Sequence, residues 1–440
     1  MPAAPRNAPR PPGLAEKRVR DAGANDGDVV LVQKDGRRWQ GVLLPHHGFS
    51  EPDVLTVKLP SGYNVGIRVD DDTEVDLVEP REPPARPERR LPAGKGLPKV
   101  SILGTGGTIA SYVDYRTGAV HPATTAGELA FATPEIFDLA DVSARVVFQV
   151  FSEDLVPANW RTLAREIAAE FRAGARGVVV PHGTDTLGFT GAALSFLLGN
   201  LPGPVVLVGA QRSSDRPSSD ASSNLQDAVA VAAGAELGEV VVVMHRGVSD
   251  GVAAIHRGNR VRKMHSSRRD AFQSPNARPL GVVRDGAVEL SDSHAPRSGG
   301  EVELRDGLEE DVALVWSHPG LKPEALHLAR KGVVLAGTGL GHVANRLVPE
   351  IARLRDRGTL VAMATQCLHG RANLAVYSTG RDLLKAGVVS AGDMLPETAY
   401  VKLMWALGRA RTPEEAAKLF ATPMAGEMDE RSDIGEFGGA

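Results

Sequence analysis

Two short runs that combine glycine with threonine could place reactive hydroxyl groups in a cleft. The first is Leu-Gly-Thr-Gly-Gly-Thr-Ile-Ala-Ser at 103–111, and the second is Val-Pro-His-Gly-Thr-Asp-Thr at 180–186. Each follows an apolar stretch typical of a buried strand, and small residues at the end of such a strand let a substrate approach the backbone. Each run alone also fits a structural role, as a glycine turn or as a helix N-cap. The repeated context favours a shared site.

These runs do not match the common nucleotide-binding loops. A dinucleotide fingerprint would need glycine at Ile109, and a Walker loop would end in Lys-Ser or Lys-Thr. The hydroxyl groups of Thr108 and Thr184 are therefore the better candidates for chemistry.

A threonine hydroxyl is a weak nucleophile and needs a base. An amine can serve when it is desolvated or lies beside another cation. Lys263 is the candidate because it stands among arginines in the segment 260–270. A solvated basic stretch is the alternative reading, and the residues of this segment taken alone favour it.

The N-terminal part of the chain must form a separate module. Residues 1–26 are rich in Pro, Ala and Arg, and we expect a flexible arm there. Residues 27–79 hold short β-rich segments joined by Asp-Gly and Ser-Gly, which is typical of a small SH3-like or Tudor-like β-barrel. The proline-rich and charged residues 80–98 indicate a linker.

From residue 99 onward, buried-strand patterns alternate with helical ones, which predicts an α/β fold. The apolar residues of 160–171 recur at helical spacing and would cover one face of a parallel sheet. A polar break at 291–300 separates a catalytic subdomain at 99–290 from a smaller subdomain at 301–425, and a frayed tail at 426–440 follows. In the smaller subdomain we expect helices over 322–331, 343–357, 397–409 and 413–420.

The composition restricts the class of protein. Lys+Arg 50 against Asp+Glu 54 gives a net charge of −4, so no global basic field attracts nucleic acid. The single cysteine, Cys367, excludes an intrachain disulfide and a multi-cysteine metal site, and its setting predicts a packed thiol in a reducing compartment. Because we find neither a signal peptide nor a long apolar run, we expect a cytoplasmic protein.

Taken together, the two runs resemble the signature motifs of the L-asparaginase family. The motifs are Thr-Gly-Gly-Thr-Ile-Ala at 105–110 and His-Gly-Thr-Asp-Thr at 182–186, with supporting similarity at 152–154, at 208–212 and in the spacing of Lys263 and Phe272. The resemblance spans about residues 99–425. It implies the two-subdomain asparaginase fold, an amidohydrolase that releases ammonia through an acyl-enzyme, and a catalytic rather than a solvated Lys263.

The same resemblance assigns roles to individual residues. It implies Thr108 as the nucleophile, with Thr184, Asp185 and Lys263 completing the catalytic set, and it leaves open which threonine attacks first. Contacts to the substrate fall on Ser152, Glu153, Gly107 and Gly183. The family's assisting tyrosine is not assigned, because Tyr112 and Tyr115 lie off the expected position near Val120-His121.

Further residues narrow the resemblance: Gly-Tyr-Asn-Val-Gly-Ile at 62–67 in the added N-terminal module, the segment 261–272, and the run 393–397 that leads into 401–405. All three resemble the D subunits of archaeal glutamyl-tRNA(Gln) amidotransferases, a branch of the asparaginase family. This resemblance implies that the chain supplies ammonia to a partner, the E subunit, which would bind ATP, Mg²⁺ and most of Glu-tRNA(Gln). It implies no cofactor or metal in this chain. It also implies a homodimer within a heterotetramer, in which residues 337–342 of one copy reach the site of the other.

Three alternatives are open at this point. A free-standing asparaginase with an accessory barrel is one, and a scaffold that has lost catalysis is another. The third is a serine hydrolase, because Gly-Val-Ser-Asp-Gly at 247–251 matches a nucleophile elbow, although the helix that such an elbow requires does not follow in the sequence.

Overall fold

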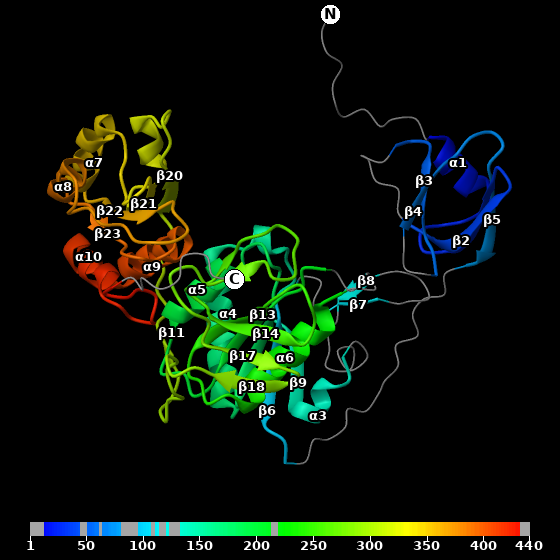
Figure 1. The fold of residues 1–440 in the computed structure, drawn as a ribbon, viewed down its shortest axis with the longest axis horizontal. Coiled ribbons are helices and arrows are strands. Elements are labelled where there is room, and N and C mark those ends of the chain that lie inside the picture. Colours follow the sequence, from blue (N-terminus) through cyan, green and yellow to red (C-terminus); the bar gives the residue numbers. More distant parts are fainter. Residues whose placement is uncertain are drawn as a thin grey trace, which may run out of the picture. The chain divides into compact units, whose positions relative to one another are not determined.

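The structure is a computed structural model that describes most of the 440 residues. It describes residues 13–44, 51–60, 64–80, 96–106, 133–212 and 219–431, together with the backbone of 111–113 and 120–122. Two compact units are present (Figure 1). Unit 1 comprises Met1–Arg90, Ser111–Pro122 and Ser213–Ser219, and unit 2 comprises the rest.

Unit 1 contains a five-stranded antiparallel sheet, as the sequence predicts for the β-module. Its strands are β1 (Val29–Lys34), β2 (Arg37–Leu43), β3 (Val54–Lys58), β4 (Asn64–Arg68) and β5 (Glu74–Glu79), in the order β4-β3-β2-β1-β5. Asp35 and Gly36 have φ values of 51° and 71°, which is the hairpin turn that Asp-Gly predicts. The predicted Ser61-Gly62 turn and the linker 81–95 lie outside the described residues. Unit 1 also contains the short hairpin β7 (Ser111–Val113) and β8 (Val120–Pro122).

The prediction of a flexible arm over 1–26 is wrong from residue 13 onward. Helix α1 spans Leu14–Asp21, and Ala15 is fully buried. Ala15 and Ala24 pack with the apolar residues of the sheet, and the backbone N–H of Leu14 donates to Asp53 at 3.1 Å. The helix is short and polar, so its stability comes from this tertiary packing, which local composition does not reveal.

The first part of unit 2 is a sheet of eight strands, in the order β18-β17-β14-β13-β12-β10-β6-β9. Five are parallel, β6 (Lys99–Gly104), β9 (Asp141–Val146), β10 (Gly177–Pro181), β12 (Val205–Val208) and β13 (Val240–His245). The strands β14 (Val252–Arg257), β17 (Gly281–Arg284) and β18 (Ala287–Leu290) extend one edge in antiparallel pairing. The predicted parallel sheet is therefore present, with an antiparallel extension.

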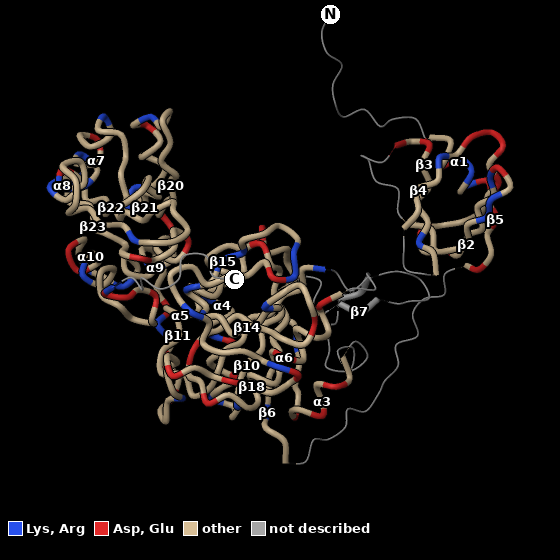
Figure 2. The backbone as a smooth tube through the Cα atoms, viewed as in Figure 1, with Lys and Arg blue, Asp and Glu red and all other residues tan. Residues whose placement is uncertain are grey.

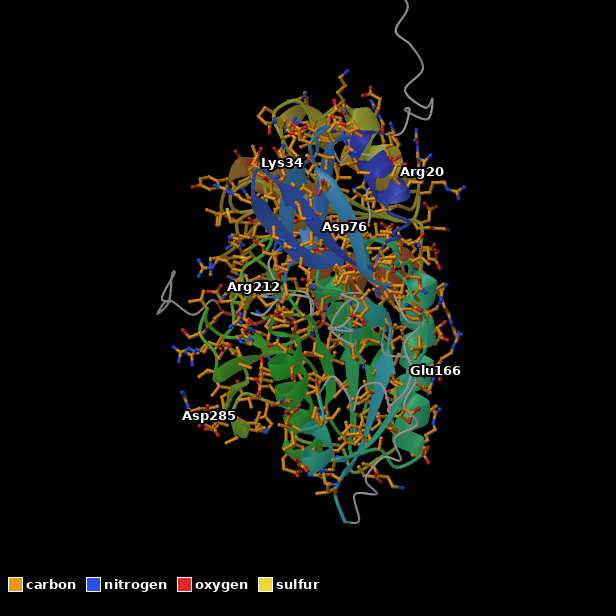
Figure 3. All side chains as sticks on the ribbon, turned by 90° about the vertical axis from the view of Figure 1, so that its right-hand side faces the viewer. Arg20, Lys34, Asp76, Glu166, Arg212 and Asp285 are labelled. Atoms are coloured by element: carbon orange, nitrogen blue, oxygen red, sulfur yellow. The ribbon has the colours of Figure 1, made fainter. Side chains whose placement is uncertain are left out.

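Helices cover both faces of this sheet. On one face lie α4 (Pro157–Arg172) and α5 (Leu187–Leu197), and on the other lie α3 (Ile136–Leu139) and α6 (Ala221–Gly234). The predicted apolar face of α4 is confirmed, since Leu163 and Ile167 are fully buried. Glu166, labelled in Figure 3, lies on the exposed side of the same helix and pairs with Arg145 at 2.6 Å.

The second part of unit 2 has a smaller parallel sheet. Its order is β20 (Val312–Trp316), β21 (Gly332–Gly337), β22 (Leu360–Thr365) and β23 (Val389–Ser390), with helices α7 (Val348–Asp356), α8 (Ser378–Lys385), α9 (Pro396–Arg409) and α10 (Pro413–Ala421). The helices predicted at 397–409 and 413–420 are confirmed. Helix α9 joins the two parts, because Trp405 on α9 and Phe196 on α5 lie 6.0 Å apart between ring centroids and share one core.

Two predicted helices of this part differ in the structure. Residues 322–331 form only a 3₁₀ segment, η2 (Pro323–Leu328), which is kinked at His327. The helix predicted to begin at residue 343 starts as the 3₁₀ turn η3 (Asn345–Leu347) and becomes α-helical at Val348, where proline occupies the first turn. Proline lacks an N–H and is tolerated in a helix only near its start, so the position of Pro349 determines where α7 begins.

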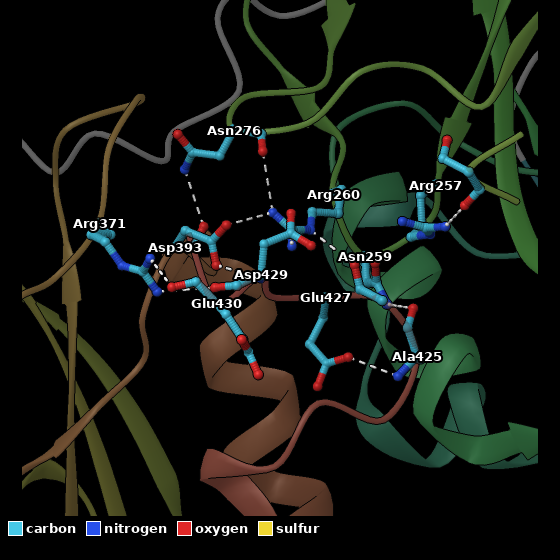
Figure 4. A network of polar contacts seen from close by, with 12 residues as sticks. Arg257, Asn259, Arg260, Asn276, Arg371, Asp393, Ala425, Glu427, Asp429 and Glu430 are labelled. Atoms are coloured by element: carbon cyan, nitrogen blue, oxygen red, sulfur yellow. Dashed lines mark hydrogen bonds and ion pairs between the residues drawn. The ribbon is translucent and has the colours of Figure 1, made fainter. Parts of the chain in front are cut away.

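The predicted frayed tail from residue 426 is wrong for residues 426–431. Glu427 is fully buried, and its carboxylate accepts the backbone N–H groups of Met424 and Ala425 and pairs with Lys402. Asp429 bonds to Arg260 at 2.9 Å (Figure 4). Glu427 and Asp429 thus pair with buried cations elsewhere in the fold. The polar residues that suggested fraying are therefore the ones that hold this segment in place.

Charges of both signs are distributed along the chain. Figure 2 shows Lys and Arg alternating with Asp and Glu in both units. Among the described residues, no helix is long and apolar enough to span a membrane.

Candidate active site

The carboxyl ends of three adjacent parallel strands bring the motif residues together. Strand β10 lies between β6 and β12, so the segments that follow them meet at one edge of the sheet. The Thr105 hydroxyl donates to the carbonyl of Pro181 at 2.9 Å and thereby joins the first motif to the second. Gly106 has a φ of 104°, and a Cβ there would lie 2.4 Å from the Val150 carbonyl oxygen. Glycine is therefore required at this turn.

The centre of the site is an ammonium group held by a hydroxyl and a carboxylate. Lys263 Nζ lies 2.9 Å from Thr184 Oγ1 and 2.7 Å from Asp185 Oδ1. The lysine side chain is 16% exposed and that of Asp185 is 65% exposed, so the pair lies at the mouth of the site. Thr184 and Asp185 stand 79 and 78 residues before Lys263 in the sequence, and the fold brings the three side chains together, as the motifs predict. The alternative of a solvated basic stretch does not describe Lys263.

The N-cap alternative for Thr184 and Asp185 is also wrong. Helix α5 begins at Leu187, its N-cap is Thr186, and no side chain bonds to the cap position. Thr186 instead donates its hydroxyl to the carbonyl of Ser152 at 2.7 Å. The Thr184 and Asp185 side chains are thus free of a capping role and face Lys263.

Ser152 and Glu153 lie beside the second motif in the short 3₁₀ turn η1 (Ser152–Asp154). A Cβ added to Gly183 would lie 2.8 Å from the Ser152 hydroxyl oxygen, so the two segments are in close contact. Ser152 is only 4% exposed. The structure therefore brings four sequence-predicted residues, Gly183, Thr184, Ser152 and Glu153, to one end of the sheet.

A buried chain of hydrogen bonds holds the backbone at Gly183 in position. The Trp160 indole donates to Thr190 Oγ1 at 3.0 Å, and Thr190 Oγ1 lies 2.9 Å from His182 Nε2. The other ring nitrogen, Nδ1, lies 2.6 Å from the carbonyl oxygen of Gly183. An Nδ1–H tautomer satisfies all three contacts, with Thr190 donating to Nε2. His182 is therefore a positioning residue of the motif and does not face the ammonium group.

Thr108 and Gly107 lie outside the described residues, as do Tyr115 and the side chains of Tyr112 and His121. The backbone register pairs Tyr112 with His121 in the β7–β8 hairpin. The roles of these residues stay predictions from the sequence motifs.

Two other predictions can be judged at this edge of the sheet. After β13 the Gly-Val-Ser-Asp-Gly run leads directly into the antiparallel strand β14, so a nucleophile elbow, which needs a following helix, is absent there. Cys367 is exposed, so the prediction of a packed thiol is wrong. The residue follows the strand end of β22 in a loop, where the preceding apolar run no longer buries it.

Known families match the chain over almost its whole length. The matching models are asparaginase, N-terminal, at residues 99–296, the glutaminase/asparaginase C-terminal domain at 311–420, and the GatD N-terminal domain at 24–78. The glutamyl-tRNA(Gln) amidotransferase D subunit of Pyrococcus furiosus is 50% identical over 94% of this chain and 97% of its own length. The chain belongs to the glutamyl-tRNA(Gln) amidotransferase D-subunit family. The D subunit of Methanothermobacter thermautotrophicus is 47% identical over 97% of this chain and 99% of its own length.

Solved asparaginase structures share the fold of about three quarters of this chain. The thermostable L-asparaginase from Thermococcus kodakarensis has a TM-score of 0.67 and 34% identity, and covers 76% of this chain and 100% of its own. L-asparaginase I from Vibrio cholerae has a TM-score of 0.65 and 30% identity, with coverage of 76% and 100%. The predicted asparaginase-like fold is therefore confirmed, and the D-subunit family adds the β-module at the N-terminus.

The sequence patterns did not reveal a buried polar cluster behind this site. Asp220 accepts the backbone N–H groups of Gln211 and Arg212 at 3.2 and 2.9 Å, and Asn224 donates to the carbonyl of Gly209 at 2.9 Å. His245 lies 2.5 Å from the Asn224 side-chain oxygen. The sequence signal that could have revealed this cluster is Asn224, a polar residue on the otherwise apolar buried face of α6.

This polar cluster holds the segment after β12, which forms a third side of the site beside the segments after β6 and β10. A Cβ added to Gly209 would lie 2.6 Å from the Thr184 methyl carbon, so the chain after β12 packs directly on Thr184. Gly209 is buried, and both of its backbone polar groups are bound, by Met244 and by Asn224. We therefore assign Asp220 and Asn224 to the support of the site in this D-subunit family member.

Burial of histidine makes the stability of this family member dependent on pH. Burial lowers the pKa of His182 to about 4, against a smaller opposing effect of the Gly183 carbonyl, and it lowers the pKa of His256 to about 4 as well. Unfolded histidine titrates near 6.5, so below that pH the unfolded chain binds protons that the folded chain does not. The contribution of these two histidines to stability is therefore full above about pH 6.5 and declines as the pH falls toward 4, by about 3 kcal/mol per histidine as an upper figure. Asp227 acts in the opposite direction, because burial and the nearby Asp285 raise its pKa to about 7 and its contribution is lost as the pH rises toward that value.

Urea unfolding at a series of pH values between 7 and 4.5 measures this decline. His256→Gln should flatten the pH dependence, because it removes one of the two titrating groups. His318→Gln is the matched control, since it replaces an exposed histidine and leaves both buried histidines in place. The same pH dependence in the native protein and in His256→Gln would contradict the prediction.

Proposed function

We propose that this chain is the ammonia-releasing component of a glutamyl-tRNA(Gln) amidotransferase. It hydrolyses the side-chain amide of glutamine or asparagine, and the ammonia serves to convert Glu-tRNA(Gln) to Gln-tRNA(Gln) on a partner protein. The observation that carries the proposal is the match to a D-subunit relative over 94% of the chain, together with the GatD N-terminal domain at residues 24–78. The meeting of Lys263, Thr184 and Asp185 supports the amidohydrolase part.

The proposed chemistry begins with attack by the Thr108 hydroxyl on the carboxamide carbon. The Thr108 oxygen–carbon bond forms as the proton of the hydroxyl passes to a base, and the carbon–nitrogen bond then breaks as the nitrogen takes up a proton and leaves as ammonia. Lys263 moves these protons through Thr184, which lies 2.9 Å from its nitrogen. Water then hydrolyses the ester and restores the threonine. Positioned acid–base groups of this kind contribute about 10²–10⁴ in rate.

Substrate contacts complete the proposed site. Ser152 and Glu153 would hold the α-carboxylate and the α-amino group, with Asp185 beside them. Backbone N–H groups near Gly107 and Thr184 would bind the oxyanion, and one such donor is typically worth about 10²–10³ in rate. The choice between glutamine and asparagine depends on the depth of the pocket by one methylene, which is worth about 1–3 kcal/mol.

The partner and the cofactors are part of the proposal. The E subunit would bind ATP and Mg²⁺ and would hold most of Glu-tRNA(Gln), and this chain would use no cofactor of its own. Its net charge of −4 supports this division, because it offers the tRNA no general attraction. Two copies of this chain would form the core of a heterotetramer, and the loop 337–342 of each copy would reach the other's site. The assembly would act in the cytoplasm.

Ammonia release is the direct test of the proposed function. The purified full chain is assayed with glutamine and with asparagine, alone and with the E subunit, ATP and Glu-tRNA(Gln). We expect release that rises when the partner and tRNA are present, together with formation of Gln-tRNA(Gln). High asparaginase turnover by the isolated chain, with no complex on co-purification and no Gln-tRNA(Gln), would instead establish a free-standing asparaginase. Thr108→Ala and Thr184→Ala should each abolish release while leaving the fold intact.

A further inference from the structure

The catalytic lysine sits on a very short strand that has a second charged residue beside it. Strand β15 consists only of Arg262 and Lys263 and pairs with β16 (Phe272–Gln273). Successive side chains of a strand point to opposite faces. Lys263 reaches Thr184 and Asp185, and Arg262 therefore points away from the site.

Arg262 reaches the other subdomain of unit 2. Its Nε lies 3.3 Å from Glu397 Oε1 in the first turn of α9, and its guanidinium carbon lies 5.8 Å from the centroid of the Trp316 ring at the end of β20. The side chains of Arg262 and Glu397 are only 24% and 19% exposed. Partial burial makes this ion pair worth more than a fully exposed one.

The rest of the β15–β16 hairpin gives the lysine limited support. Val261 and Phe272 are buried and hold its base, whereas the residues 264–268 that follow Lys263 are exposed. The ion pair of Arg268 with Asp270 stays within that exposed turn. Within β15 itself, the side chain of Arg262 reaches helix α9, and just before the strand Thr398 of α9 donates to the carbonyl of Asn259 at 2.7 Å.

Helix α9 also contacts helix α5, which directly follows the Thr184–Asp185 segment. Its Tyr400 makes an edge contact with Phe189 of α5, with ring centroids 6.3 Å apart. Helix α5 begins two residues after Asp185. The same helix therefore contacts both the strand that carries the lysine and the helix that follows the threonine–aspartate pair.

Glu397 depends on Arg262 for its counter-ion. One carboxylate oxygen faces Arg262, and the other, Oε2, is buried without a hydrogen-bond partner among the described residues. Removing the guanidinium would leave this carboxylate half-buried and unpaired, and the hairpin would shift to admit water.

We propose that Arg262 is a positioning residue for Lys263. Its ion pair with Glu397 and its stacking on Trp316 hold β15 against the second subdomain, so that the lysine nitrogen stays within hydrogen-bond distance of Thr184 and Asp185. A misplacement of about 1 Å in such a site can cost about 10²-fold in rate. The inference rests on the proposed catalytic role of Lys263.

The test compares Arg262→Met, Arg262→Lys, Glu397→Gln and Trp316→Ala in the full chain with its amidotransferase partner. Arg262→Met keeps the apolar stem but removes the charge, and we expect kcat for ammonia release to fall about 10–100-fold with KM little changed. Arg262→Lys should recover most of the loss, because it restores an ion pair with Glu397. The double variant of Arg262→Met with Glu397→Gln should be no worse than Arg262→Met alone, because both remove one interaction.

Controls separate this positioning role from general stability and from the catalytic assignment. Arg268→Met removes an arginine from the same hairpin without touching the second subdomain and should keep native kcat. Trp316→Ala alters a residue that is 41% exposed, so it tests the stacking contact even if Arg262→Met does not fold. If Lys263→Met retains native turnover, the catalytic role itself fails. If Lys263→Met is inactive while Arg262→Met or, failing that, Trp316→Ala keeps native kcat, only the positioning proposal is overturned.

Discussion

Replacing Lys263 with methionine is expected to lower ammonia release by about 10²–10⁴-fold, the range that a positioned acid–base group supplies. Methionine keeps an unbranched stem of similar length, so the packing around β15 should persist. What is lost is the nitrogen that lies 2.9 Å from Thr184 Oγ1 and 2.7 Å from Asp185 Oδ1. Ammonia measured with saturating glutamine or asparagine gives kcat directly.

A matched control is available in the second subdomain. Lys385 pairs with Asp382 at 3.1 Å on the exposed face of α8, with side chains 78% and 53% exposed. Lys385→Met therefore removes a lysine–aspartate pair of the same chemistry away from the site, and its turnover should equal the native value. Turnover by Lys263→Met within a few-fold of that control would refute the catalytic assignment.

The second large effect concerns stability and lies where the two subdomains of unit 2 meet. Arg260 is 1% exposed, and its guanidinium bonds to Asp393 at 2.8 Å and to Asp429 at 2.9 Å (Figure 4). It also donates to the carbonyl oxygens of Gly426 at 2.9 Å and Asn276 at 3.3 Å. One side chain thus joins the first subdomain, the segment before α9 and the C-terminal segment.

Arg260→Met is expected to reduce the free energy of unfolding by about 3–5 kcal/mol, because removal of one partner leaves the buried Asp393 carboxylate without its cation. Urea denaturation followed by circular dichroism measures the loss. Arg330→Met is the matched control, since Arg330 is 91% exposed in its pair with Asp311 and should change stability by less than about 1 kcal/mol. Equal stability of the two variants would show that the buried network contributes no more than a surface ion pair.

The same network explains why the sequence pattern of the tail was misleading. Residues 426–431 are polar and glycine-containing, and such a composition usually indicates fraying. Here Glu427 and Asp429 each meet a buried cation, Lys402 and Arg260, that stands far away in the sequence. Burial lowers the pKa of Lys402, and the adjacent Glu427 carboxylate opposes that shift. Composition cannot reveal a partner that only the fold supplies.

The sequence by itself determined the strand-and-motif framework of the site. An apolar strand followed by a small-residue turn has few alternatives, so the two motifs identified the edge of the sheet, and the spacing of apolar residues identified α4 and α9. The Asp-Gly turn of the β-module followed from backbone sterics alone, because only a few residues accept its positive φ. Each of these features depends on interactions within a few residues.

The tertiary structure was needed for every feature that depends on contacts between segments far apart in the sequence. It showed that Lys263 turns toward Thr184 and Asp185 while Arg262 turns toward Glu397, a choice that depends on side-chain contacts with segments 78 residues and more away. It also ordered α1 and the C-terminal segment through burial. Thr108 lies outside the described residues, so its role stays a prediction from the motif. The local sequence pattern thus predicted which groups carry the chemistry, and packing between distant segments determined where Lys263, the group expected to move the protons, is held.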